Sequence, residues 1–272
     1  MLLNGSNLPV ICEAERVKCP PLSMNYTLYT QIAWAWMAVA VVTFFYLLRQ
    51  NAPYGRHVQP GWGPTVDNRL GWFVMEFTVI VVFLTALLWS GIPAPKPVWV
   101  FGALFLFHYV NRSIIFPLRL RTRGKRMPVV IMLSAVGFNL MNGFLLGYYF
   151  AHFANYPPDW WFDIRFLLGM MLFWTGLGIN WQSDNILLGL RAPGATGYAI
   201  PRGGLFGRVS CPNHLGEMIE WAGFALMTWA LPAWAFFVWT AANLAPRALA
   251  HHRWYKEKFA DYPAERKALW PF

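Results

Sequence analysis

Residues 70–92 read LGWFVMEFTVIVVFLTALLWSGI, an apolar run that is interrupted by one acidic residue, Glu76. A helix needs about 20 mostly apolar residues to cross the hydrocarbon core of a bilayer. This run is long enough for one crossing and holds a single charged side chain. We therefore predict a transmembrane helix here, and a fold that consists of helices crossing a membrane.

Six further segments of the chain resemble this run in length and hydropathy. The whole sequence is 57% hydrophobic and only 12% charged, which lies outside the usual composition of soluble proteins. The seven expected spans are residues 24–48, 70–92, 98–116, 128–153, 162–181, 213–229 and 232–245. We predict an all-α, multi-pass integral membrane protein with seven transmembrane helices.

The basic residues predict how these helices are oriented, because cytoplasmic loops of membrane proteins collect Lys and Arg. With seven spans, 18 of the 22 Lys and Arg fall on the side that holds the C-terminus. We therefore place the N-terminus outside and the C-terminus in the cytoplasm. The net charge of +10 follows from this sidedness and gives no reason to expect a nucleic-acid partner. The membrane is either a bacterial inner membrane, which we favour, or the endoplasmic reticulum.

We expect a single domain, residues 1–272, because no repeat and no Gly/Ser-rich linker divides the chain. Residues 1–23 are expected to form a short external leader, and they lack the pattern of a cleavable signal peptide. Cys12 and Cys19 lie on the predicted outer side, where a disulfide can form, and Cys211 lies on the reducing side. Three cysteines without ligand-like spacing argue against a structural metal site.

Glu76 is the most unusual residue of the second span, because a carboxylate inside a membrane is costly. One interpretation is structural, in which the carboxyl group hydrogen-bonds a neighbouring helix. The other, which we favour, is a neutral carboxylic acid that donates a hydrogen bond in a functional site. Tyr109 and Arg112, at the end of the third span, leave a similar choice open between membrane anchors and site residues.

Polar residues at helical spacing mark a second region of interest. Asn213, Glu217 and Glu220 share one face of a helix, since they stand at positions i, i+4 and i+7. Two further pairs stand four residues apart, Asn180 with Asp184 and His251 with Tyr255. Polar side chains of this kind are suited to bind a ribose, an amide or a phosphate group of a ligand. The chain has only six His, too few for the histidine boxes of membrane di-iron enzymes, so we predict no metal.

These segments together resemble the steroid 5α-reductase family, whose members are membrane-bound, NADPH-dependent enzymes that reduce a conjugated enone. The resemblance extends from about residue 54 to residue 272. It rests on five segments in matching order, which are residues 163–166, 178–184, 213–221, 251–255 and 261–269. We therefore interpret the chain as a member of this family, and as a microbial one.

The resemblance implies roles for individual residues. Glu76 and Tyr109 match the pair that engages the substrate ketone. The positions that match the cofactor pocket are Arg123, Asn180, Asp184, Arg191, Tyr198, Asn213, Glu217, His251, Tyr255 and Arg266. Residues 24–116 are implied to contribute the substrate pocket, and residues 117–272 to form the NADPH pocket. The implied partners are a steroid or related enone lipid and the surrounding membrane lipid, with no obligate protein partner.

The implied reaction is the NADPH-dependent reduction of the 4,5 double bond of 3-oxo-Δ4 steroids to 5α-steroids. Hydride attack on the β-carbon of an enone requires stabilisation of the charge that builds on the carbonyl oxygen. Tyr109 and a neutral Glu76 are suited to donate the two hydrogen bonds that this needs. Arg191, Arg266 and Arg123 are suited to pair phosphates, including the 2′-phosphate that distinguishes NADPH from NADH.

Two positions depart from the family pattern, and three alternatives stay open. Met75 stands where the animal enzymes carry Gln, and His214 stands where they carry an apolar residue. The alternatives are a reductase of linear enoyl lipids, a membrane methyltransferase that uses S-adenosylmethionine, and a sterol-binding protein without turnover. The presence of both Glu76 and Tyr109 argues against the last of these.

Overall fold

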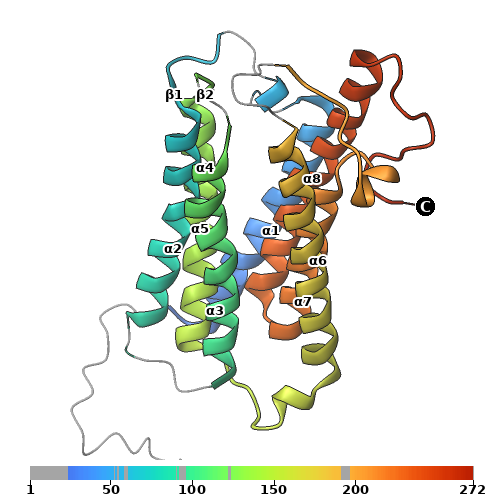
Figure 1. The fold of residues 1–272 in the computed structure, drawn as a ribbon. Helices are drawn as coiled ribbons and strands as arrows, with labels where there is room; N and C mark the ends of the chain where they lie inside the picture. The colour runs from blue at the N-terminus through green and yellow to red at the C-terminus, as the bar shows by residue number, and fades with distance from the viewer. Residues whose placement is uncertain are drawn as a thin grey trace, which may run out of the picture.

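The computed structural model describes residues 24–51, 53, 55–57, 61–89, 91, 96–121, 124–190 and 197–271. Long helices run side by side in alternating directions and form a bundle (Figure 1). In chain order they are α1 (Tyr26–Arg49), α2 (Asn68–Leu88), α3 (Lys96–Val110), α5 (Val129–His152), α6 (Ile164–Gly189), α7 (Pro212–Thr228) and α8 (Leu231–Lys258). A π turn, Asn111–Ile115, and the short α4 (Phe116–Arg119) continue α3.

Each of the seven predicted spans corresponds to one of these long helices, and five have the length and hydropathy of a membrane crossing. These five are α1, α2, α3 continued through α4, α5 and α6. The chain is therefore mostly helical and has the character of a multi-pass membrane protein. Among the described helices, α7 and α8 do not meet the same limits, so the count of seven crossings and the orientation stay predictions.

Side-chain caps fix where three of the helices begin. The side chain of Asn25 accepts a hydrogen bond from the backbone N–H of Leu28 at 2.8 Å, and Asp67 caps α2 in the same way. Asp163 accepts hydrogen bonds from the guanidinium and the backbone N–H of Arg165, which lower the pKa of Asp163 to about 2. Each cap satisfies a backbone donor that a first turn leaves without a partner, so these boundaries are encoded locally.

Two short strands form an antiparallel ribbon that the all-α prediction did not include. They are β1 (Thr65–Asp67) and β2 (Arg126–Pro128), and Val66 pairs with Met127. Three-residue strands give no periodic signal in a sequence, which is why the ribbon was not predicted. It joins the starts of α2 and α5, which pack against each other. Single 3₁₀ turns cover Gly55–His57, Trp160–Phe162 and Gly204–Gly207.

α6 and α7 pack closely because glycines lie at their contact. A Cβ atom on Gly176 of α6 would lie 2.2 Å from the backbone nitrogen of Glu220, and one on Gly216 of α7 would lie 2.5 Å from that of Asn180. Only hydrogen fits at these positions, as is usual where membrane helices approach closely. The contact lets the Asn180 side chain reach α7, where its Nδ2 donates to the backbone carbonyl of Asn213 at 3.0 Å.

Aromatic side chains fill the centre of the bundle, and other apolar side chains cover its outside. The central group consists of Phe83, Phe101, Phe105, Phe173, Trp221 and Phe224. On α1, large side chains such as Trp34, Val42 and Phe45 are exposed, as expected of a helix that lipid surrounds. The opposite face of α1 packs on α8, where the ring centroids of Trp36 and Trp239 are 4.5 Å apart.

Candidate active site

Glu76 of α2 and Tyr109 of α3 line the same cavity, which has a volume of about 650 Å³ and which we call the Glu76 cavity. The larger apolar side chains in the rest of its wall are Trp36, Trp72, Met75, Met127, Phe138, Phe236 and Trp239. Cavities of roughly 300–1,000 Å³ with a mainly apolar wall are typical sites for small molecules. The Glu76 cavity therefore suits an apolar ligand that presents a hydrogen-bond acceptor to Glu76 and Tyr109.

A second cavity, of about 260 Å³, brings together six of the predicted cofactor residues, and we call it the Asp184 cavity. These six are Asp184 of α6, Tyr198 of the following loop, Asn213 and Glu217 of α7, and His251 and Tyr255 of α8. The α7 pair and the α8 pair each stand one helical turn apart, so each pair presents two side chains to the same space. His214, one of the two departures from the family pattern, lines this cavity as well.

The Glu76 and Asp184 cavities adjoin, because Trp72, Arg112, Glu217, Leu244 and Arg247 line both. Arg112 Nη1 lies 3.4 Å from Asp184 Oδ2, and the guanidinium lies over the ring of Trp72 at 5.0 Å. Arg112 therefore connects the wall of one cavity to a carboxylate of the other. Two ligands bound in these cavities would be neighbours, as transfer of a group between two bound molecules requires.

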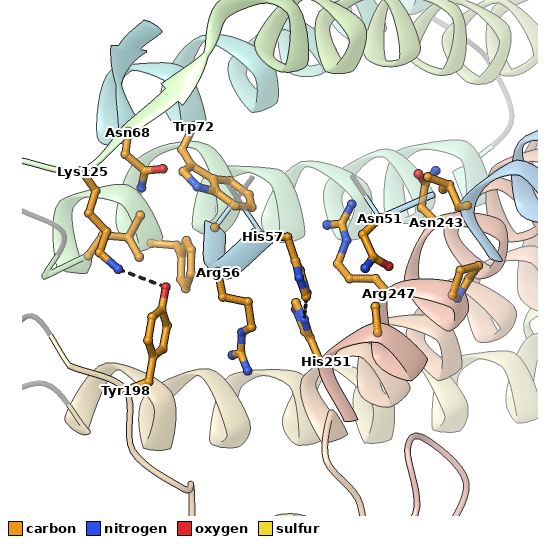
Figure 2. Close-up of a pocket in the computed structure, with 16 residues that line it drawn as sticks. Asn51, Arg56, His57, Asn68, Trp72, Lys125, Tyr198, Asn243, Arg247 and His251 are labelled. Atoms are coloured by element: carbon orange, nitrogen blue, oxygen red, sulfur yellow. Dashed lines mark hydrogen bonds between the residues drawn. The ribbon is translucent and has the colours of Figure 1, made fainter. Parts of the chain in front are cut away.

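A third cavity, of about 250 Å³, lies beside the Gly55–His57 turn, and we call it the His57 cavity (Figure 2). His57 and His251 point toward each other, with His57 Nε2 3.0 Å from His251 Nδ1. Burial and the nearby charge of Arg56 lower the pKa of His57, so at pH 7 this imidazole is neutral. At the other side of the cavity, Lys125 Nζ donates to the Tyr198 hydroxyl at 3.3 Å.

Arg56 is not among the residues that the sequence predicts for the site, yet it lines both the Asp184 and the His57 cavities. Its guanidinium lies over the rings of Tyr198, Trp254 and Tyr255, at 5.5, 4.8 and 4.5 Å from their centroids. Stacking of this kind holds a planar cation in one orientation. Its Nη1 is buried and has no hydrogen-bond partner within the described part of the chain. A buried cationic donor of this kind fits an anionic group of a ligand.

The charges around the Asp184 cavity fit a ligand that carries phosphates. Two carboxylates and four arginines line it, namely Asp184, Glu217, Arg56, Arg112, Arg121 and Arg247. Guanidinium groups are the preferred partners of phosphate, which they bind through paired hydrogen bonds. The residues present, with the buried donor of Arg56 among them, therefore fit a dinucleotide cofactor.

Among the described residues, two of the predicted cofactor residues, Asn180 and Arg266, are not among the side chains that line these cavities. Asn180 is buried between α6 and α7, where it bonds the backbone of Asn213. Arg266 is buried with its guanidinium 5.3 Å from the ring centroid of Tyr262, and its Nε and Nη1 lack partners among the described residues. The positions that lie outside the described residues are Arg123 and Arg191, together with Cys12 and Cys19.

Glu220 does not accompany Asn213 and Glu217 into the Asp184 cavity, although it stands on the same predicted helix face. It turns toward α3, where its Oε1 lies 2.7 Å from Nδ1 of His108, and both side chains are almost fully buried. The His108 ring also packs on the Trp221 ring at a centroid distance of 4.6 Å. His108 directly precedes Tyr109 in the chain. Its buried contact with Glu220 therefore supports the part of α3 from which Tyr109 projects.

Known proteins that resemble this chain are named steroid 5-alpha-reductases or 3-oxo-5-alpha-steroid 4-dehydrogenases. Residues 125–272 match the family described as 3-oxo-5-alpha-steroid 4-dehydrogenase. A steroid 5-alpha-reductase of Gossypium hirsutum is 42% identical, over 92% of this chain and 99% of its own length. The Arabidopsis thaliana steroid 5-alpha-reductase is 46% identical, over 82% of this chain and 87% of its own length. The 3-oxo-5-alpha-steroid 4-dehydrogenase 1 of Homo sapiens is 40% identical, over 90% of this chain and 95% of its own length.

These relatives come from plants and a mammal, so the expectation of a microbial member is not borne out. The matches cover most of the chain and nearly the full length of each relative. They also include both the segment that carries Tyr198 and the segment that carries His251 and Tyr255. The chain belongs to the 3-oxo-5-alpha-steroid 4-dehydrogenase family.

Proposed function

We propose that this chain is an NADPH-dependent steroid 5α-reductase, which reduces the 4,5 double bond of 3-oxo-Δ4 steroids to 5α-steroids. The observation that carries the proposal is the placement of Glu76 and Tyr109 in one largely apolar cavity of a chain of this family. The relatives are named as steroid 5-alpha-reductases or 3-oxo-5-alpha-steroid 4-dehydrogenases, which supports the same reaction.

Glu76 and Tyr109 supply the electrostatic part of the reaction. Negative charge develops on the C3 carbonyl oxygen as the enone is reduced, and two hydrogen-bond donors stabilise it. Tyr109 donates its hydroxyl proton, and Glu76 donates as a neutral carboxylic acid, because an ionised carboxylate has no proton to give. The mainly apolar wall makes the cavity less polar than water, which strengthens both hydrogen bonds.

The Asp184 cavity is the proposed NADPH site. Arg56, Arg112 and Arg247 would face the phosphates, and the predicted set of polar residues would hold the sugars and the nicotinamide amide. Four further residues stay predicted members of this cofactor site, namely Arg123, Arg191, Asn180 and Arg266. NADPH, when bound, supplies the hydride, and the protein supplies the position and the charge environment.

The division of the chain between the two sites is proposed with one change. Glu76 and Tyr109 come from residues 24–116, as the family resemblance implies. Asn139 of α5 and Phe236 of α8 nevertheless line the Glu76 cavity, and Arg56 and Arg112 line the Asp184 cavity, so each part of the chain would contribute to both proposed sites.

The test is turnover by the full chain, purified in detergent, with progesterone as the 3-oxo-Δ4 steroid. We expect NADPH oxidation and 5α-product to appear in equal amounts, and NADH to be a poorer donor. A linear enoyl lipid serves as the competing substrate. Reduction of that lipid with the steroid left untouched would contradict the proposal and favour an enoyl-lipid reductase, and neither activity would favour a sterol-binding protein.

A further inference from the structure

Asn139 of α5 is a polar residue inside a predicted span, is only 2% exposed, and lines the Glu76 cavity. Its Nδ2 donates to the backbone carbonyl of Met75 in α2 at 2.6 Å. A backbone carbonyl can only accept a hydrogen bond, so this contact determines which end of the amide is the nitrogen. The amide nitrogen consequently faces α2 at the residue that precedes Glu76.

The amide nitrogen carries two hydrogens, and the Met75 carbonyl takes one of them. Asn139 and Glu76 line the same cavity, and the carboxyl group of Glu76 lies within hydrogen-bonding reach of the Asn139 side chain, where the second hydrogen is available to it. An N–H group can only donate, so the Glu76 oxygen that faces it is the acceptor. In a neutral carboxylic acid this acceptor is the carbonyl oxygen, which leaves the proton on the other oxygen.

We infer that Asn139 is a positioning residue, which orients the neutral carboxyl group of Glu76 so that its O–H points to the substrate ketone. The inference rests on the proposed function and deepens it. The last torsion of a glutamate side chain has only a broad intrinsic preference, so an unrestrained carboxyl group samples several orientations. A donor that is fixed before the reaction stabilises developing charge without reorganisation at the moment of transfer.

Asn142, one turn further along α5, is a natural comparison because it is a buried asparagine with a purely structural environment. Its Oδ1 accepts from Trp36 Nε1 at 3.1 Å, and its Nδ2 donates to the Phe138 carbonyl at 2.8 Å. Asn142 is not among the residues that line the Glu76 cavity. The Oδ1 of Asn139, by contrast, has no hydrogen-bond partner among the described residues. An unpaired buried oxygen is costly, which sets Asn139 apart from a residue retained for stability alone.

The experiment compares Asn139→Leu, Asn139→Asp and Asn142→Leu in the detergent-purified full chain, with progesterone and NADPH as substrates. Asn139→Leu removes both donor hydrogens. Asn139→Asp keeps the shape of the side chain and carries at most one donor hydrogen, which cannot serve Met75 and Glu76 together. We expect kcat to fall about tenfold or more in both, the size of one lost hydrogen bond, while the Kd for NADPH stays unchanged. Asn142→Leu should lower Tm and leave kcat close to the parent value.

A second set of variants shows whether Asn139 acts through Glu76. In the Glu76→Leu background, Asn139→Leu should change kcat far less than in the parent, because the carboxyl group that it orients is gone. Equal factors in both backgrounds would overturn the inference, as would Asn139 variants whose kcat matches that of Asn142→Leu. A parent protein that leaves the steroid untouched would overturn the proposed function and this inference with it, whereas an active parent with unaffected Asn139 variants would overturn the inference alone.

Discussion

Arg56, Glu76 and Asn139 are the polar side chains on which the two proposed sites depend most. A carboxylate within an apolar run is costly, so the position of Glu76 in the chain is enough to mark it as a candidate site residue. Asn139 gives a signal of the same kind within the predicted span 128–153. Arg56 gives none, because the rings of Trp254 and Tyr255 that hold it are far along the chain.

The contribution of Arg56 to cofactor binding is testable by substitution. Arg56→Ala should raise the Kd for NADPH about tenfold or more, because one hydrogen bond to a charged group contributes about 1.5–3 kcal/mol. Arg202→Ala is the control, since Arg202 is an exposed arginine that does not line the Asp184 or His57 cavity. The measurement is NADPH titration, accompanied by Tm without cofactor. An unchanged Kd in a folded Arg56→Ala protein would remove Arg56 from the proposed site.

At the scale of the elements, α6 and α8 extend beyond the point where hydropathy ends the predicted spans. α6 ends at Gly189 rather than at residue 181, and α8 ends at Lys258 rather than at residue 245. Hydropathy reports burial in lipid, whereas a helix continues through polar residues of good helix propensity. The additional turns carry Asp184, His251 and Tyr255 to the Asp184 cavity.

The number, order and type of the long helices could therefore be predicted from periodic and apolar patterns, as could the pairing of site residues one turn apart. Hydropathy does not predict where α6 and α8 end, and no periodic pattern predicts the ribbon of β1 and β2. Arg266 lies in an irregular tail, where no periodicity relates its direction to that of its neighbours. Its surroundings depend on tertiary contacts, such as the one with Tyr262.

The glycine contact between α6 and α7 leads to a prediction about stability. Gly176→Ala would place a methyl group 2.2 Å from the backbone of Glu220, and should destabilise the fold by about 1–3 kcal/mol, as overpacking does. Gly178→Ala is the control on the same helix, because a Cβ there meets nothing within 4 Å, and it should be neutral or slightly stabilising. Thermal unfolding of the two purified variants compares them. Equal Tm values would mean that the close approach of the helices is not essential.

At the scale of the whole molecule, the segments predicted to be cytoplasmic gather at one end of the bundle. The Gly55–His57 turn, the ribbon of β1 and β2, the loop before α7 and the C-terminal tail all lie there (Figure 1). These segments carry Arg56, Lys125 and Tyr198, which line the Asp184 or His57 cavities. The proposed cofactor site therefore lies toward the end that holds most of the basic residues, the side on which a soluble, phosphorylated cofactor is expected.

The orientation itself is testable in intact cells. Because the predicted seven spans put 18 of the 22 Lys and Arg on the side of the C-terminus, a cysteine added after Phe272 should resist a membrane-impermeant thiol reagent. The same cysteine should react once the cells are permeabilised, which is the control for its accessibility. In a chain in which Cys12 and Cys19 are replaced by Ser, labelling of the added cysteine from outside in intact cells would contradict an N-terminus outside and a C-terminus in the cytoplasm.

The central claim is that two neutral donors in the Glu76 cavity activate the ketone of a 3-oxo-Δ4 steroid, and the rate of NADPH-dependent progesterone reduction by variants tests it most directly. Glu76→Gln keeps a donor of similar size and should retain measurable turnover. Glu76→Leu and Tyr109→Phe each remove a donor and should lower the rate ~10²-fold or more, at unchanged affinity for NADPH. A protein that combines Glu76→Leu with Tyr109→Phe and still reduces progesterone at the parent rate would contradict the claim.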